Sequence, residues 1–207
     1  MRILKILILL FSLSMLGQTT DLSEREISEF ETELTEMANR TSSFSADFMQ
    51  VKHMKTMENQ LETKGKVYFK SPDFLKLEYA KPMDYHILFK DGMLYINEGG
   101  EKSEMDLGSN KLFQKMGVLI SGCLNGKILQ DPNNFEIAYS RSDNSITAKI
   151  IPQDKKLAGM FKEIYLNFGP KNLIKSVKLV DPTGDYTQIN MTNLQINKPI
   201  SASVFEH

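Results

Sequence analysis

The apolar and polar positions of this chain follow two different periods, and the first of them predicts a helix near the start. Between residues 22 and 39, apolar side chains recur every three to four positions, which is the pattern of an amphipathic helix. Ser23 and Glu26 have the S-x-x-E spacing of a capping box, which supports a helix start at this point. The predicted apolar stripe consists of Ile27, Phe30, Leu34 and Met37.

From residue 44 onward the period changes to two, which predicts β-strands with one apolar face. The alternation is clear in residues 44–48 and 75–79, and Asp91-Gly92 has the composition of a tight hairpin turn. Similar segments, separated by turn residues, continue almost to the end of the chain. We count about ten or eleven antiparallel strands, two helices and no linker, and predict one mainly β domain with helices (α+β) over residues 18–207.

The second predicted helix, residues 112–124, interrupts the strands with the sequence LFQKMGVLISGCL. Its glycines disfavour a helix by about 1 kcal/mol each relative to alanine, so the segment is not optimised to stay helical. The pattern permits two interpretations: a permanent part of the core, or a lid that closes reversibly over an apolar cavity. The apolar stripe consists of Leu112, Phe113, Met116, Leu119, Ile120, Cys123 and Leu124.

Residues 1–17 have the layout of a secretory signal peptide. Arg2 and Lys5 form a positive start, an apolar run follows, and Gly17 precedes polar chain. The run is too short for a stable membrane span, although a retained N-terminal anchor is the alternative interpretation. The only cysteine is Cys123, so the cysteine that a lipoprotein signal requires is missing. We therefore expect a soluble protein of the periplasm.

Charge and candidate chemistry narrow the function classes. The chain has 25 basic and 26 acidic residues; without Arg2 and Lys5 the mature protein has 23 and 26, a net charge of −3. No basic run suggests a nucleic-acid partner. His53, His86 and His207 are scattered without metal-ligand spacing, and no nucleophile motif is present. We expect no catalytic residue, no metal and no cofactor.

The sequence GKVYFKSPDFLKLEYAKP (65–82), followed by ILFKDGMLYI (87–96), resembles the LolA family of periplasmic outer-membrane lipoprotein carriers. SFSADFMQ (43–50) precedes it in the family's order, and Pro72 and Pro82 match family positions. The resemblance implies an unclosed, curved antiparallel β-barrel whose helices form a lid over a hydrophobic cavity. It also favours the lid interpretation of residues 112–124.

The resemblance places residues 74–79 on the strand that lines the family's cavity. A glutamate in place of Leu75 is accordingly expected to abolish acyl-chain loading and to leave the protein folded. One position departs from the pattern: better-known members have a lid-latching arginine before the matching proline, where this chain has Ser71. The predicted cavity and lid residues are Phe48, Val67, Phe69, Leu75, Leu77, Tyr79, Ile87, Phe89, Leu112, Met116, Leu119 and Ile120.

The resemblance further implies a set of partners. These are lipoprotein acyl chains as cargo, an ATP-driven exporter in the inner membrane and an acceptor at the outer membrane, with the carrier expected to act as a monomer. Two alternatives stay open: a carrier or sensor of another amphiphile such as a glycolipid, and a strand-rich periplasmic interaction protein without cargo.

Overall fold

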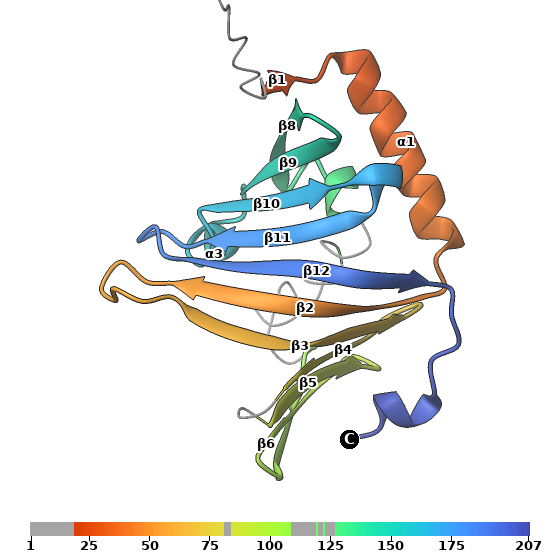
Figure 1. The fold of residues 1–207 in the computed structure, drawn as a ribbon, viewed down its shortest axis with the longest axis vertical. Coiled ribbons are helices and arrows are strands. Elements are labelled where there is room, and N and C mark those ends of the chain that lie inside the picture. The colour runs from red at the N-terminus through yellow and green to blue at the C-terminus, as the bar shows by residue number, and fades with distance from the viewer. Residues whose placement is uncertain (1–18, 81–83, 109–118, 120–121, 123–126) are drawn as a thin grey trace, which may run out of the picture.

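A curved, twelve-stranded antiparallel sheet dominates the computed structural model, which describes residues 19–80, 84–108, 119, 122 and 127–207 (Figure 1). The strands are β1 (Thr20–Asp21), β2 (Ser43–His53), β3 (Leu61–Lys70), β4 (Phe74–Tyr79), β5 (Tyr85–Lys90), β6 (Met93–Glu98), β7 (Glu101–Asp106), β8 (Phe135–Ser142), β9 (Ser145–Pro152), β10 (Glu163–Phe168), β11 (Ile174–Val180) and β12 (Tyr186–Ile196). Their spatial order is β1-β8-β9-β10-β11-β12-β2-β3-β4-β5-β6-β7, so β1 and β7 are the edges of one unclosed sheet.

The predicted unclosed antiparallel sheet is confirmed, and its strand number exceeds the count from the sequence because β1 has only two residues. Such a strand is too short to show an alternating pattern. The predicted signal peptide lies outside the described residues. The predicted helix over residues 112–124 also lies outside them, except for Leu119 and Gly122, which are both helical and buried.

The helices are α1 (Glu24–Arg40), α3 (Lys155–Ala158) and three short 3-10 helices, η1 (Lys127–Gln130), η2 (Pro170–Asn172) and η3 (Ala202–Phe205). The capping box of α1 is confirmed: the Ser23 hydroxyl accepts from the Glu26 backbone, and the Glu26 carboxylate accepts from the Ser23 backbone N–H at 3.0 Å. The helix α3 was not among the predicted elements; its signal in the sequence is Asp154, an N-cap that accepts from two backbone N–H groups. No helix of the described part of the chain is long and apolar enough to cross a membrane.

The core lies between the inner face of the sheet and α1. Phe30 of α1 packs edge-on against Tyr139 of β8 and Phe168 of β10, with ring centroids 5.8 and 5.3 Å apart. The Tyr139 hydroxyl donates to the Glu31 carboxylate at 2.6 Å. The pKa of Tyr139 is raised, mainly by its burial and to a smaller extent by this hydrogen bond. The centre of the core, formed by Ile150, Ile164 and Leu166, is completely inaccessible to solvent. The apolar stripe of α1 thus covers the β8–β10 half of the sheet.

The C-terminal tail crosses to the outer face of β4, β5 and β6 (Figure 1). Phe205 of η3 packs against Phe74, and Lys90 donates to the Phe205 carbonyl at 3.4 Å. On the same outer face Leu88 is only 1% exposed, although it points away from the main core. The tail therefore gives this end of the sheet a second, smaller apolar contact on its outer side.

Asn197 joins the tail to the start of β2 and the end of α1. Its side-chain oxygen accepts from the Ser42 backbone N–H, the Ser42 hydroxyl and the Ser43 backbone N–H at 2.8, 3.1 and 3.3 Å. Its side-chain nitrogen donates to the Arg40 carbonyl at 2.8 Å, and its φ of 54° lies in the left-handed region that asparagine tolerates. One side chain therefore holds three segments together.

Replacing Asn197 by alanine is expected to lower the free energy of unfolding by about 1–3 kcal/mol, because four hydrogen bonds that join three segments of the chain are lost together. Urea unfolding measures this loss. Asn193→Ala is the matched control, since Asn193 has the same φ of 54° but donates only one side-chain bond, to Asp47 at 2.8 Å. Equal losses in the two variants would show that backbone strain, rather than the hydrogen bonds, is responsible.

Candidate ligand-binding cavity

An apolar cavity of about 220 Å³ lies on the inner face of the sheet, at the turn from its β8–β12 half into its β2–β7 half. Strands β2, β3, β4, β5, β11 and β12 supply its walls, and Leu119 and Phe161 complete the described lining. The lining residues are Phe48, Gln50, Val67, Leu77, Tyr79, Ile87, Leu119, Phe161, Val177, Leu179, Thr187, Ile189 and Met191.

Strand register explains how residues distant in sequence form one wall. Val67 of β3 is paired with Leu77 of β4, and Leu77 is paired with Ile87 of β5, so three side chains stand side by side. On the other side, Met191 of β12 is paired with Phe48 of β2. The period of two then keeps every second residue of each strand on the cavity side.

The structure brings six of the twelve predicted site residues to this cavity: Phe48, Val67, Leu77, Tyr79, Ile87 and Leu119. Phe69 and Leu75 are on the same face but are buried in the core, and Phe89 is partly buried against that core. The remaining three, Leu112, Met116 and Ile120, lie outside the described residues.

The burial of Leu75 changes the expected effect of the Leu75→Glu substitution. Leu75 is 2% exposed and does not line the cavity. A glutamate at this position would place an unpaired charge in the core, which is strongly destabilising. The substitution is thus expected to unfold the protein rather than to impair loading alone. Leu77, which is half-buried and lines the cavity, is the better position for that test.

Seven lining residues were missed by the sequence analysis: Gln50, Phe161, Val177, Leu179, Thr187, Ile189 and Met191. Alternation predicted the strands that carry most of them, but it does not say which strands become neighbours. The pairing of β12 with β2, between segments far apart in the sequence, brings them to the cavity. Phe161 follows α3, in a connection whose conformation the pattern does not predict.

Polar groups of the cavity gather near Gln50. The Tyr79 hydroxyl donates to the Gln50 side-chain oxygen at 3.0 Å, and Thr187 is the only other lining residue with a polar side chain in the described part. Burial, with a smaller contribution from Tyr85, raises the pKa of Tyr79, so this phenol stays neutral at physiological pH. The described lining contains no charged side chain. Such a cavity suits a neutral, apolar ligand.

Gly65 allows the aromatic side of the cavity to form. It lies opposite Phe48 in β2 and opposite Tyr79 in β4. A Cβ atom at Gly65 would approach the Phe48 Cζ atom to 2.5 Å and the Glu78 carbonyl oxygen to 2.3 Å. Any side chain at this position would therefore clash with both atoms unless one of them moved. The Phe48 ring instead lies over this glycine and packs edge-on against Tyr79, with centroids 5.2 Å apart.

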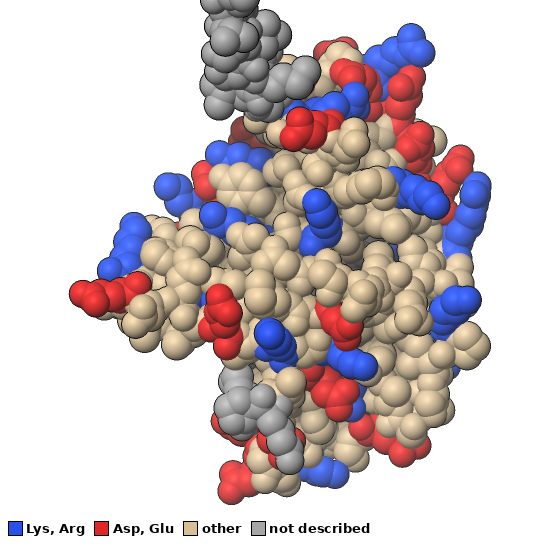
Figure 2. All heavy atoms as spheres, viewed as in Figure 1, with Lys and Arg blue, Asp and Glu red and all other residues tan. Residues whose placement is uncertain are grey.

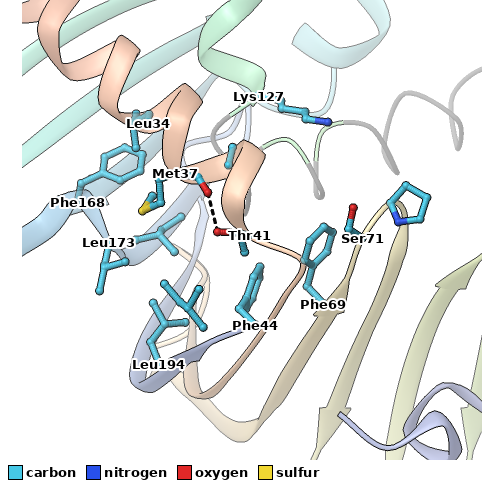
Figure 3. Close-up of a pocket in the computed structure, with 14 residues that line it drawn as sticks. Leu34, Met37, Thr41, Phe44, Phe69, Ser71, Lys127, Phe168, Leu173 and Leu194 are labelled. Carbon is cyan, nitrogen blue, oxygen red and sulfur yellow. Dashed lines mark hydrogen bonds between the residues drawn. The ribbon is translucent and has the colours of Figure 1, made fainter. Parts of the chain in front are cut away.

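A second apolar pocket, of about 60 Å³, lies beneath the last turns of α1 (Figure 3). Phe44 and Phe69 are stacked in its wall with centroids 5.2 Å apart, and Thr41 donates to the Met37 carbonyl at 2.7 Å. Ser71, where the resemblance noted in the sequence leads us to expect a latching arginine, lines this pocket rather than the cavity. The pocket has room for about two water molecules, so the larger cavity is the candidate ligand site.

Metal chemistry finds no support among the described residues, which contain no group of three or more His, Cys, Asp or Glu side chains that could hold an ion.

The family profile described as "Outer membrane lipoprotein carrier protein LolA" matches residues 39–207. No curated protein sequence matches the chain. Among solved structures, MucB of Pseudomonas aeruginosa in complex with MucA aligns with a TM-score of 0.53 and 11% identity, over 88% of this chain and 61% of that one.

Two further solved structures align over almost their whole length. The lipoprotein LppX of Mycobacterium tuberculosis has a TM-score of 0.49 and 10% identity, over 86% of this chain and 99% of that one. A LolA-superfamily protein of Nitrosomonas europaea has a TM-score of 0.45 and 9% identity, over 87% and 97%. At such identities these likenesses concern the fold alone.

Proposed function

Because the chain belongs to the LolA family of outer-membrane lipoprotein carrier proteins, we propose that it binds lipoproteins by their acyl chains and carries them between membranes. The family's fold is that of non-enzymatic carriers that bind lipoproteins or lipids. The observation that supports the proposal for this chain is the uncharged apolar cavity on the inner face of the sheet.

The energetics of acyl chains explain why a carrier is needed. Each CH₂ group that leaves an apolar environment for water costs about 0.8 kcal/mol, so a lipid with two or three long chains does not cross an aqueous compartment unaided. A protein that offers apolar surface in exchange removes most of this cost. No covalent chemistry is required of it, which agrees with a lining without charged groups.

The size of the cavity suggests how binding and release are balanced. A cavity of about 150 Å³ accommodates benzene, so 220 Å³ holds on the order of ten carbon atoms and not a whole diacyl lipid. Loading must therefore displace side chains that close the cavity, among which Leu119 is 2% exposed. The free energy of this closure competes with the cargo and lowers its apparent affinity, which permits release without chemistry.

The cellular route is part of the same proposal. Residues 1–17 would direct export to the periplasm and then be removed. An ATP-driven exporter of the inner membrane would load the carrier, and an acceptor at the outer membrane would receive the lipoprotein. The carrier would act as a monomer.

Native mass spectrometry of the protein purified from the cell envelope tests the proposal. We expect a fraction of the molecules to carry a lipoprotein whose mass includes its acyl groups. A glycolipid in its place would identify the protein as a carrier of another amphiphile. A protein that is always empty, and that also fails to take up a fluorescent fatty acid, would contradict the carrier function.

A further inference from the structure

The hairpin between β2 and β3 has two large exposed apolar side chains, Met57 in its turn and Leu61 at the first residue of β3. Met57 is 40% exposed and Leu61 is 47% exposed, and this hairpin projects from the body of the protein at the left of Figure 1. The described residues contain only one other exposed side chain of this kind, Met105 of β7, at 36%. Single exposed apolar residues are ordinary, so the presence of two in one projecting hairpin is the feature that needs an explanation.

The hairpin lies beside the polar end of the cavity. Two cavity residues of β12, Thr187 and Ile189, are paired with Lys52 and Gln50, which belong to the last four residues of β2 before the turn. Gln50 is three residues from the end of the strand, a distance of about 10 Å. Anything that touches the hairpin is thus close to the end of the cavity where Gln50, Tyr79 and Thr187 gather.

The base of the hairpin is held in place by the neighbouring β11–β12 hairpin. The Lys55 backbone N–H donates to the Asp185 carboxylate at 2.9 Å, and the Lys55 ammonium group donates to the Thr183 carbonyl. His53 stacks on Tyr186 with ring centroids 4.9 Å apart. These contacts use polar groups where β2 runs into the turn, whereas Met57 in the turn and Leu61, which is paired with Lys52, stay exposed. The tip is therefore presented in an ordered conformation, which reduces the entropy lost on binding.

Charge contributes little at this hairpin. Lys52, Lys55 and Lys64 oppose Glu58 and Glu62, which leaves a net charge of +1 over residues 52–64 when histidine is neutral. Figure 2 shows positive and negative side chains intermixed over the visible face, including its projecting left end. A partner recognised here is consequently recognised by apolar contact more than by charge.

We propose that the projecting end of the β2–β3 hairpin, from the turn that carries Met57 to Leu61 at the start of β3, is a membrane-contact site, which inserts these two side chains into the interfacial region of a lipid bilayer. Backbone groups of a turn stay hydrogen-bonded to water and headgroups at this shallow depth, so a hairpin tip can enter where it could not span. Two side chains give only weak, reversible attachment. This places one end of the cavity beside the bilayer during loading or delivery, and then lets the carrier leave.

Vesicle sedimentation of the purified mature protein tests this site. One set of vesicles contains phosphatidylcholine alone, and the other contains equal parts of phosphatidylcholine and phosphatidylglycerol. We expect the protein to associate with both, and we expect the double variant Met57→Glu, Leu61→Glu to lower the partition coefficient roughly tenfold. Met105→Glu, which places the same charge on an exposed methionine of β7, is the matched control and is expected to change nothing.

Several outcomes would overturn the membrane-contact site. One is that the unmodified protein associates with neither kind of vesicle. Another is that it associates only with the anionic vesicles and that salt abolishes this association. A third is that Met105→Glu lowers the partition coefficient as much as the double variant does. Binding of a fluorescent fatty acid separates this proposal from the carrier function, because the double variant is expected to keep it. A protein that binds vesicles through the hairpin but takes up no fatty acid would contradict only the carrier proposal.

Discussion

Replacing Leu77 by glutamate is expected to weaken acyl-chain binding at least tenfold while the protein stays folded. Leu77 is half-buried, lines the cavity, and stands between Val67 and Ile87 in the wall of paired strands. A carboxylate there would have to lose its hydration when an apolar chain enters, at a cost that exceeds the gain from several buried CH₂ groups. Titration with a fluorescent fatty acid measures the affinity.

Leu77→Met is the matched control for this prediction, because it conserves volume and apolar character and is expected to keep the affinity within a few-fold. Circular dichroism and the thermal unfolding midpoint of both variants establish that the fold is intact. If Leu77→Glu bound the fatty acid as tightly as the unmodified protein, the ligand site would have to lie elsewhere. The smaller pocket beneath α1 would then be the next candidate.

The second large effect is expected at Gly65. Alanine at this position is predicted to lower the free energy of unfolding by about 3 kcal/mol, since its Cβ atom would lie 2.3 Å from the Glu78 carbonyl oxygen and 2.5 Å from the Phe48 ring. The ring can rotate away, but the carbonyl belongs to the paired strand β4, and moving it disturbs the ladder. For a protein of this length the midpoint of thermal unfolding should fall by about 6–12 °C.

Gly169→Ala provides the comparison for Gly65→Ala. Gly169 has a φ of −94°, and a Cβ atom there would meet nothing closer than the Lys175 side chain at 3.5 Å, an ordinary contact. The midpoint of thermal unfolding of Gly169→Ala is expected to stay within about 2 °C of that of the unmodified protein. A similar, small effect in both variants would mean that β3 and β4 can separate at little cost.

The Phe48 ring displaced by Gly65→Ala should also reduce fatty-acid binding, since Phe48 lines the cavity.

The local periods in the sequence were sufficient to predict the elements. Ser23 with Glu26 located the start of α1, and the stripe of Phe30 and Leu34 identified its buried face. Alternation located the strands, and it placed Val67 with Phe69, and Leu77 with Leu75 and Tyr79, on one face of their strands. These signals are reliable because each depends on residues within one or two turns of helix or along one strand.

Predicting the cavity itself required long-range information. Phe69 and Leu75 alternate in the same way as Val67 and Leu77, and nothing local distinguishes a core position from a cavity position. The distinction depends on what packs against each side chain. Phe69, for example, is covered because the Phe44 ring is stacked on it.

The sequence by itself determined the alternating strands and the capped amphipathic helix, because patterning and capping are local properties. Only the tertiary structure decided which inward side chains fill the core and which leave a cavity, and that β12 beside β2 supplies Ile189 and Met191 to it. It likewise decided that Met57 and Leu61 stay exposed on a hairpin braced by β11–β12. The physical reason is that burial is a property of neighbours, and strand pairing brings together neighbours that are more than a hundred residues apart in the chain.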